Sequence, residues 1–494
     1  MKTHTMFSSL DRATLLLSKR ARTRIWESCM LGWLLLLVGC NVQPANERQI
    51  GRQPDIFPDY IGVTVPIDMA PLNFAMADDS VSRIDVTVNG NRGGSLHVGG
   101  KYANFPMKEW RELLNQNRGS RLSVSVAAYR DGSWTRYRSF FINVSDDSIG
   151  ARSITYRRIA PDYEQYGRMG IYKRNLSDFK ETSIVDNSDR LGMCVNCHTS
   201  NGGCVDEYVF HARGEHAGTF IRRNGHLSRV VMPDLSSETT QSSYPIPRFL
   251  LYPSWHPGGR YCAFSTNKTS QMFHLANAEK RMEVYDAESD VFIYDAEKNR
   301  IIIDTLTMRH YWAENCPAFS PDGRWLYFVT APRGQYSTSY DQKCYSLCRV
   351  AFDERTGHFT GAVDTLINTP DQPSITWPRP SADGRYLMYT VVNWGYFSIW
   401  HPEADLWLLD LQTGEQRCME EVNSPHADSF HNWSPSGNWF LFTSRRGDGP
   451  YTRIYLSRIG YDGRATKPFL LPMRNPRDYK TKLTYSFNTP EFQL

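Results

Sequence analysis

A short motif that recurs four times constrains this 494-residue chain more than any other feature. In its clearest copy, Ser320–Arg324 reads S-P-D-G-R and precedes a run of aromatic and aliphatic residues. The glycines that mark the copies lie 53 to 64 residues apart, at Gly259, Gly323, Gly384 and Gly437. A period of this size is typical of propeller blades or of another closed array. The sequence therefore predicts a repeating β-structure in its C-terminal half.

Each copy is predicted to form a β-hairpin. Asp-Gly supplies a tight turn in which the glycine takes a positive φ, and the alternating residues that follow form a strand. Two matching segments between the copies, Asp290–Asp295 and Asp405–Asp410, are predicted as further strands. With 27 Tyr, 24 Phe, 34 Gly and 27 Pro, the composition also favours a turn-rich β-protein over a helical bundle.

These repeats resemble the signature of the TolB-type, WD-repeat-like β-propeller family over about residues 250–470. The resemblance implies a mainly β chain whose propeller has about six blades. We expect the propeller at 207–475 and a closing segment at 476–494, in which a strand at Lys482–Phe487 is expected to close the ring. The resemblance also implies that the residues before each turn lead the innermost strand and line the central channel. The predicted binding funnel consists of Glu314, Asn315, Trp377, His426, Asp428 and His431.

A different domain is predicted before the repeats, at residues 61–150. The alternation of Ile84, Val86 and Val88 predicts a strand, and an apolar face at helical spacing predicts a short helix at Met107–Asn115. We interpret this region as a small β-sandwich or α+β module. Residues 151–206 are expected to form an irregular connector to the propeller.

The N-terminus resembles a bacterial lipoprotein signal. Basic residues precede the apolar run Met30–Gly39, which is too short for a membrane span but suits a signal peptide. The run ends in L-V-G-C at Leu37–Cys40, which is similar to a lipobox. The resemblance implies removal of residues 1–39, a lipid anchor on Cys40 and a tether at 40–60. The alternative is an uncleaved apolar helix that ends in cysteine.

The predicted export places the protein on the periplasmic side of a bacterial cell envelope. Asn41 is not the Asp that favours retention at the inner membrane in many bacteria, so the outer membrane is the better expectation. The formal net charge of the whole chain is +4, and loss of residues 1–39 leaves a neutral mature chain. A neutral chain argues against nucleic acid as a partner and favours another envelope protein.

The second informative motif is C-x-x-C-H at Cys194, Cys197 and His198. This spacing attaches haem c through two thioethers, and the histidine supplies an axial ligand to the iron. In an exported chain we therefore predict covalent haem, with Met232 or His211 as the other axial ligand. A redox dithiol, a disulfide or a metal site that also uses Cys204 are the alternatives.

Three classes of function follow from these motifs. The first is a lipid-anchored haem protein that transfers electrons or binds a partner. The second is a haemless propeller scaffold that binds proteins or glycans in the cell envelope. The third is a hydrolase in which Glu314 and Asp428 act as acid and base, but no G-x-S-x-G nucleophile elbow occurs in the chain. The sequence therefore favours a binding or electron-transfer protein over an enzyme.

Overall fold

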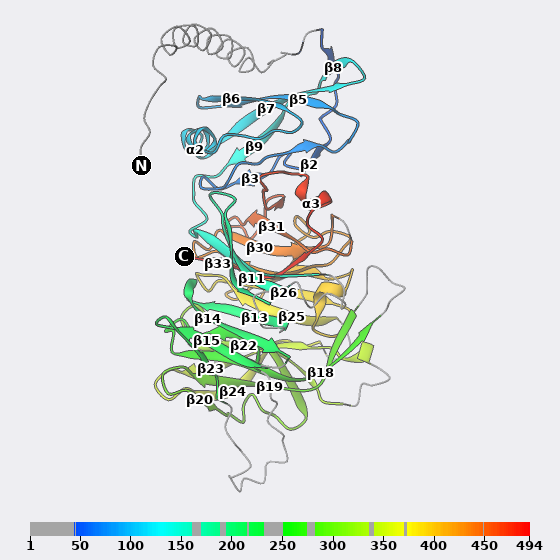
Figure 1. The fold of residues 1–494 in the computed structure, drawn as a ribbon. Coiled ribbons are helices and arrows are strands. Elements are labelled where there is room, and N and C mark those ends of the chain that lie inside the picture. Colours follow the sequence, from blue (N-terminus) through cyan, green and yellow to red (C-terminus); the bar gives the residue numbers. More distant parts are fainter. Residues whose placement is uncertain are drawn as a thin grey trace, which may run out of the picture.

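The computed structural model describes Pro44 and residues 46–160, 169–187, 194–214, 217–231, 250–273, 282–334, 340–369, 373–447 and 449–494. Figure 1 shows a small N-terminal domain beside a larger body of stacked sheets. The predicted signal peptide, Cys40 and Met232 lie outside the described residues. Within the described ranges, no helix combines the length and hydropathy that a membrane span requires.

The N-terminal domain is an α+β module built on one seven-stranded sheet. Its main strands are β5 (Arg83–Gly90), β6 (Ser95–Gly100), β7 (Ser120–Arg130), β8 (Ser133–Arg136) and β9 (Phe140–Val144), with short β1 (Arg48–Gln49) and β3 (Thr64–Val65) at the sides. A two-stranded sheet of β2 (Ile56–Phe57) and β4 (Ala75–Met76) completes it. Ile84, Val86 and Val88 are buried, as their alternation predicts.

The predicted helix is confirmed as α2 (Met107–Gln116). It buries Trp110, Leu113 and Leu114, which share one face because residues three and four apart are neighbours on a helix. Pro106 precedes the helix, in the extended conformation, as its N-cap. The helix therefore covers the sheet with a single apolar stripe.

The rest of the described chain forms six four-stranded sheets, the blades of a β-propeller. Blade 1 contains β33 (Ser486–Gln493), β10 (Ser153–Ile159), β11 (Gly170–Asn175) and β12 (Glu181–Asp186). Blade 2 contains β13 (Cys194–Asn201), β14 (Cys204–Arg213), β15 (Gly218–Arg223) and β16 (His226–Arg229). Blade 3 contains β17 (Leu251–Trp255), β18 (Tyr261–Phe273), β19 (Met282–Asp295) and β20 (Arg300–Ile302).

The last three blades follow the same order. Blade 4 contains β21 (Trp312–Phe319), β22 (Trp325–Pro332), β23 (Ser346–Asp353) and β24 (His358–Ile367). Blade 5 contains β25 (Ser374–Pro380), β26 (Tyr386–Val392), β27 (Asp405–Asp410) and β28 (Gln416–Cys418). Blade 6 contains β29 (Asp428–Trp433), β30 (Trp439–Ser444), β31 (Arg453–Arg458) and β32 (Phe469–Leu470). Short helical turns are η2 (Tyr340–Gln342), η3 (Ser398–Trp400) and α3 (Asp478–Thr481).

The C-terminal strand closes the ring. β33 pairs antiparallel with β10, so that Gln493 lies opposite Ser153 and Phe487 opposite Arg158. Six strands contact one another around the centre, in the order β33, β13, β17, β21, β25 and β29, and β29 contacts β33 in turn. We call these the inner strands. One blade is therefore assembled from both ends of the propeller sequence.

This closure corrects the predicted boundaries. Residues 151–206, expected to form an irregular connector, contain β10–β13, so the propeller begins at β10 rather than near residue 207. The strand predicted at 482–487 lies further on, at Ser486–Gln493. The repeat signature did not reveal blade 1 because its inner strand comes from the other end of the chain, so no turn joins that strand to β10.

The predicted turns occupy the corners between the inner strand and the second strand of a blade. Gly259, Gly323, Gly384 and Gly437 all have φ between +72° and +77°, as predicted for the glycine of each turn. Gly323 of blade 4 also lies against His256 of blade 3. A Cβ added to Gly323 would lie 2.2 Å from Nε2 of His256, so a larger residue does not fit there. That nitrogen donates a hydrogen bond of 3.2 Å to the Gly323 carbonyl. The turn therefore also locks blade 4 against blade 3.

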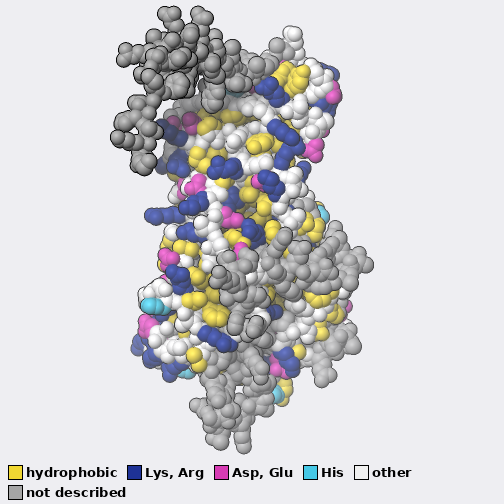
Figure 2. Space-filling view, viewed as in Figure 1, with side chains coloured by type: hydrophobic (Ala, Val, Ile, Leu, Met, Phe, Trp, Pro, Cys, Tyr) yellow, Lys and Arg dark blue, Asp and Glu magenta, His cyan; other side chains and the backbone are white. Residues whose placement is uncertain are grey.

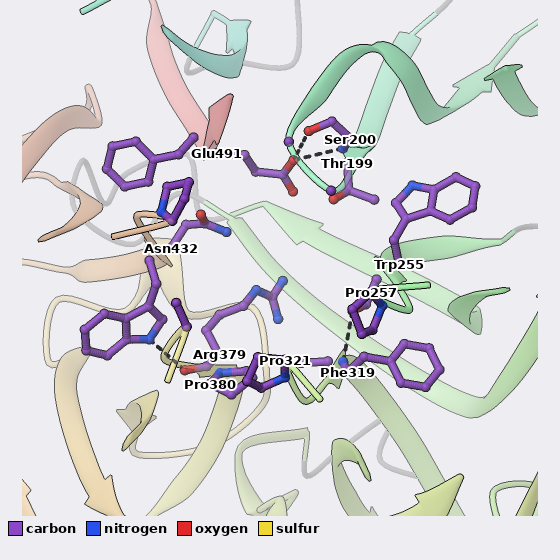
Figure 3. Close-up of a pocket in the computed structure, with 18 of the residues that line it drawn as sticks. Thr199, Ser200, Trp255, Pro257, Phe319, Pro321, Arg379, Pro380, Asn432 and Glu491 are labelled. Carbon is purple, nitrogen blue, oxygen red and sulfur yellow. Dashed lines mark hydrogen bonds between the residues drawn. The ribbon is translucent and has the colours of Figure 1, made fainter. Parts of the chain in front are cut away.

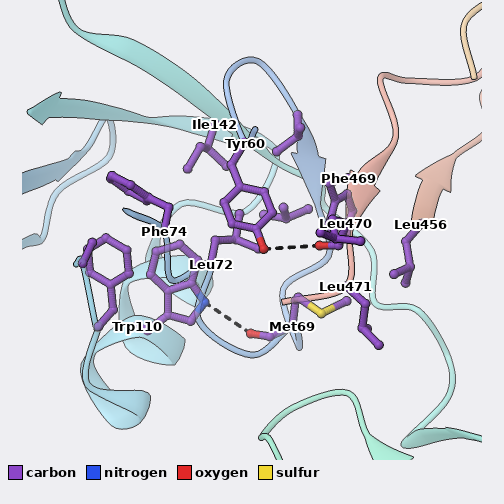
Figure 4. Packing of buried hydrophobic residues seen from close by; sticks show 14 of the residues in the cluster. Tyr60, Met69, Leu72, Phe74, Trp110, Ile142, Leu456, Phe469, Leu470 and Leu471 are labelled. Atoms are coloured by element: carbon purple, nitrogen blue, oxygen red, sulfur yellow. Dashed lines mark hydrogen bonds between the residues drawn. The ribbon is translucent and has the colours of Figure 1, made fainter. Parts of the chain in front are cut away.

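The N-terminal domain packs against the side of the propeller formed by blades 1 and 6 (Figure 1). One hydrophobic cluster includes Leu72 and Trp110 from the domain and Leu456 and Leu470 from blade 6 (Figure 4). Tyr60, fully buried, donates a hydrogen bond of 3.3 Å to the carbonyl of Leu470. The two parts therefore share a core. On the face drawn in Figure 2, basic and acidic side chains are interspersed over both parts.

Candidate functional site in the propeller channel

All six inner strands have the same irregularity. Each contains a shift in pairing register and one non-glycine residue with φ between +44° and +53°. A bulge of this kind bends a strand and re-aims its side chains. The residues at this position, which we call the bulge position, are Cys197, Tyr252, Cys316, Trp377, Phe430 and Thr489.

Aromatic side chains at the bulge position close the middle of the channel. The Trp377 ring meets Tyr252 at 5.2 Å between centroids and Phe430 at 4.8 Å, both edge to face. Trp377 is only 4% exposed. It was predicted to line a polar funnel, but it belongs instead to an aromatic plug, because the bulge turns its side chain toward other bulge-position rings. These three rings form the aromatic plug, at the level of the bulges in the inner strands.

The C-x-x-C-H motif lies on the inner strand β13. Cys197 occupies the bulge position, with Cys194 three residues before it and His198 directly after it. Cys197 is buried and Cys194 is partly exposed, and both thiols are free. Burial raises the pKa of Cys197 above its ordinary value. The motif is thus part of the innermost strand of blade 2.

His198 and His431 occupy equivalent places, one residue after the bulge. The other four inner strands have proline there, at Pro253, Pro317, Pro378 and Pro490. Nε2 of His431 donates a hydrogen bond of 3.0 Å to the carbonyl of Met388 in blade 5. His198 is 6% exposed, and neither of its ring nitrogens has a hydrogen-bond partner among the described residues. Burial lowers the pKa of both histidines to about 3, so both rings are neutral.

This geometry corrects the predicted role of His431. Its ring lies between blades 5 and 6 and bonds backbone, so it is a packing residue rather than part of a channel surface. The residue after a bulge faces the neighbouring blade, and sequence alone did not reveal that register.

A buried arginine adjoins the motif. Arg157 of β10 donates a hydrogen bond to Oδ1 of Asn196. Burial lowers the pKa of Arg157, while the nearby thiols of Cys194 and Cys197 act in the opposite direction. Arg213 lies directly opposite Cys194 in the register of β13 and β14. The motif therefore has cationic side chains on two sides.

His211 and Met232 are the two candidates for the second axial ligand of the haem iron. His211 lies in β14 opposite Asn196, fully buried, with Nδ1 3.1 Å from Oγ1 of Thr219. Met232 lies outside the described residues. In the part of the chain that the structure describes, no three His, Cys, Asp or Glu side chains form a group that could hold a metal ion.

The remaining predicted funnel residues lie before the bulge in β21 and near the start of β29. Glu314 accepts a hydrogen bond of 2.7 Å from Arg309, and burial raises its pKa to about 8 despite that arginine. Asn315 donates to Asp286 at 2.9 Å. Asp428 forms an ion pair of 2.7 Å with Arg446.

Each of the two carboxylates proposed as acid and base is thus held by its own arginine, and no contact joins them among the described residues. The backbone N–H of His426 donates to Ser424. Among the described residues, no hydrogen bond or ion pair joins Glu314, Asn315, His426, Asp428 and His431 to one another.

A cavity of about 360 Å³ lies at the part of the inner strands that follows the bulge (Figure 3). It is lined by the residues two places after the bulge in all six inner strands. These residues are Thr199, Ser254, Ala318, Arg379, Asn432 and Glu491. Aromatic residues from the following position, Trp255, Phe319, Trp433 and Phe492, also line it.

The two charged groups of this cavity are Arg379 and Glu491. Figure 3 shows the Arg379 guanidinium pointing into the cavity. Its Nη1 donates to the Pro378 carbonyl at 2.8 Å, and in the described structure it forms no ion pair. Glu491 accepts from the Ser200 backbone N–H at 3.1 Å, and burial raises its pKa to about 7.

The sequence placed Trp255 and Arg379 among the residues before the turns that are expected to line the channel, but it did not select Glu491 or Thr199. Glu491 was missed because the closing strand was expected to end at residue 487. Thr199 was missed because β13 carries the cysteine motif and was assigned to a connector. The signal that would find both is the position of a residue relative to the bulge, which requires the inner strands to be aligned with one another.

No family model and no curated protein sequence matches this chain. Among solved structures, TolB from Acinetobacter baumannii has 11% sequence identity and a TM-score of 0.44, over 78% of this chain and 85% of that one. Kuenenia stuttgartiensis hydrazine synthase has 11% identity and a TM-score of 0.32, over 54% and 64%. An oligogalacturonate lyase from Vibrio parahaemolyticus has 9% identity and a TM-score of 0.32, over 83% and 100%. Similarity at this level carries no functional argument, and the assignment as a β-propeller rests on the six closed four-stranded sheets.

Proposed function

We propose that this chain is an exported c-type haem protein whose propeller holds the haem through Cys194, Cys197 and His198. The observation that carries the proposal is the state of His198, which is buried beside two free thiols with no partner for either ring nitrogen among the described residues. In the equivalent His431, Nε2 donates to a backbone carbonyl and only Nδ1 lacks a partner among the described residues. A buried polar group without a partner costs about 1–3 kcal/mol, and coordination of iron by His198 removes that cost.

The residues around His198 also suit a haem c. The two thiols would form the thioethers, and Arg157 and Arg213 would pair with the propionate groups, since a guanidinium matches a carboxylate well. When bound, a haem c supplies one-electron transfer or binding of a small ligand at iron. Cys197 is only 9% exposed in the folded ring, so its thioether would form before blade 2 packs.

Covalent haem is tested by expression together with a c-type maturation system. The protein is expected to keep a haem absorption spectrum after denaturation and to gain the mass of one haem. Cys194→Ser and Cys197→Ser are each expected to remove one thioether and shift the α-band of the reduced pyridine complex. His198→Ala is expected to lower haem content at least several-fold.

Two matched controls accompany this test. Cys316 occupies the bulge position of β21, and His431 occupies the place of His198 in β29. Cys316→Ser and His431→Ala are expected to leave haem content unchanged in the folded protein. An unmodified polypeptide mass, from cells that mature other c-type cytochromes, would refute the proposal and favour a redox dithiol or a haemless scaffold.

We also propose that Cys40 carries the lipid that anchors the protein at the periplasmic side of the outer membrane. The support is the L-V-G-C sequence after the apolar run Met30–Gly39. Each buried CH₂ of a lipid chain contributes about 0.8 kcal/mol to membrane binding. Wild type is expected to fractionate with outer membranes and Cys40→Ala with soluble protein. A wild type that is soluble and unlipidated would contradict the anchor, whatever the haem content.

On this proposal the partner is another protein of the cell envelope that exchanges electrons with the haem. A neutral mature chain and the mixed surface charge of Figure 2 suit a protein partner better than nucleic acid. We expect one envelope redox protein to co-purify with the wild type but not with the double variant Cys194→Ser/Cys197→Ser.

A further inference from the structure

The cavity lined by Arg379 and Glu491 is not used by the proposed haem site. Cys194, Cys197 and His198 are not among the residues that line it, and Thr199, which directly follows His198 in β13, is the first lining residue of that strand. We propose that this cavity binds a small aromatic monocarboxylate, with the carboxylate on Arg379 and the ring between the aromatic walls. This inference is independent of haem attachment.

The charged residues of the cavity indicate that the ligand carries an anionic group. The Arg379 guanidinium points into the cavity and forms no ion pair within the described residues (Figure 3). Arg379 is partly buried, with Glu491 as the acidic group near it, and a guanidinium that has no ion-pair partner takes a carboxylate through two parallel hydrogen bonds. Glu491 lines the same cavity, so a dianion such as phosphate would meet more repulsion than a single carboxylate does.

The aromatic residues that line the cavity indicate that the rest of the ligand is a flat apolar ring. Trp255, Phe319, Trp433 and Phe492 line the cavity and present flat apolar surfaces. Trp255 is 9% exposed, and its indole N–H is buried without a partner among the described residues, so it offers a second donor to a ligand oxygen. Trp433 donates to the Arg379 carbonyl at 2.9 Å and holds that strand in place.

Size limits the ligand to a small molecule. Ligand sites of proteins usually have volumes of about 300–1,000 Å³, and this cavity, at about 360 Å³, is near the lower end. One aromatic ring with a short acidic side chain fits such a volume. An oligosaccharide or a peptide of several residues does not.

The test is calorimetric titration of the mature full chain with benzoate and phenylacetate, and with benzamide as the neutral counterpart. We expect at least one acid to bind at least tenfold more tightly than benzamide. Arg379→Gln is expected to weaken that binding at least tenfold, Arg379→Lys less, and Trp255→Phe a few-fold because the ring remains while the donor is lost.

Arg349→Gln is the control for loss of an arginine. Arg349 lies over the Trp325 ring and pairs with Asp364, away from the cavity, so its loss is expected to leave acid binding unchanged. The inference is overturned if neither acid binds, if benzamide binds as tightly as the acids, or if folded Arg379→Gln binds as wild type does. Cyclohexanecarboxylate that binds as tightly as benzoate would overturn the aromatic assignment.

Discussion

At the scale of single residues, equivalence between blades decides which side chains are unusual. His198 and His431 occupy the same place in two inner strands, yet only His431 bonds the neighbouring blade. Arg379 and Glu491 are likewise the charged members of a set whose other members are small or neutral. Residues that depart from their structural equivalents therefore mark the two candidate sites.

Asp147 offers a test of the contact between the two parts of the molecule. It accepts hydrogen bonds from the Trp439 indole at 3.1 Å and from Arg458 at 3.0 Å. Trp439 is fully buried, so Asp147→Ala leaves its N–H without a partner. We expect a loss of about 1–3 kcal/mol in the free energy of unfolding, measured by urea denaturation. Asp146→Ala, at a residue 77% exposed, is the control and is expected to change little.

Glu314 predicts a pH dependence of stability. Burial raises its pKa to about 8 from an ordinary 4.5, against the opposing effect of Arg309, while Asp290 raises it and Arg333 lowers it. Between these values the folded chain keeps a proton that the unfolded chain releases, so stability falls as pH rises from 4.5 to about 8. Glu314→Gln is expected to flatten this fall in the melting temperature. A variant with the same pH profile as wild type would show that Glu314 ionises normally.

At the scale of elements, the bulge in each inner strand organises the channel. It places one side chain in the plug, the next between blades and the following one in the cavity. A one-residue slip of an inner strand would exchange these roles, because side chains alternate between faces. The arrangement of each repeat therefore depends on the bulge in its inner strand as well as on the glycine turn that follows that strand.

The closing strand β33 is expected to control the stability of the whole ring. Phe492 is 5% exposed and pairs with Ile154 of β10. Phe492→Ala is expected to cost about 3–5 kcal/mol, because a large buried ring leaves a cavity. Leu494→Ala, at a side chain 61% exposed, is the control and should cost little. Equal denaturation midpoints for the two variants would mean that closure by β33 contributes little.

At the scale of the whole molecule, the N-terminal domain and the propeller are expected to unfold together, because one hydrophobic cluster spans both. Tyr60→Ala removes a fully buried ring at that contact and should cost about 3–5 kcal/mol. Hydrogen exchange should then accelerate in β30 and β31 of blade 6 more than in blade 3. Tyr461→Ala, at a residue 90% exposed, should leave the exchange unchanged. Faster exchange confined to the N-terminal domain would show that the two parts are energetically separate.

Local sequence patterns predicted much of this architecture. The four glycine turns, the strands after them and the helix at Met107–Gln116 follow from residue spacing, because turn geometry and amphipathic periods depend on near neighbours. The first blade did not follow, because β10–β12 carry no repeat signature and take their inner strand from the C-terminus. Arg379 was expected to line the channel, but the cavity that it shares with Glu491 did not follow, because it joins residues from six strands.

The sequence by itself therefore determined that the chain repeats, where its hairpins turn and that Cys194, Cys197 and His198 stand at the spacing of haem attachment. Only the tertiary structure decided that His198 lacks the carbonyl partner that His431 has, that aromatic rings plug the channel, and that Arg379 shares a cavity with Glu491. The physical reason is the distance in sequence between the residues that make each contact. Turns and periodicities arise from contacts within a few residues, whereas a channel is made by the register of strands that are distant in sequence.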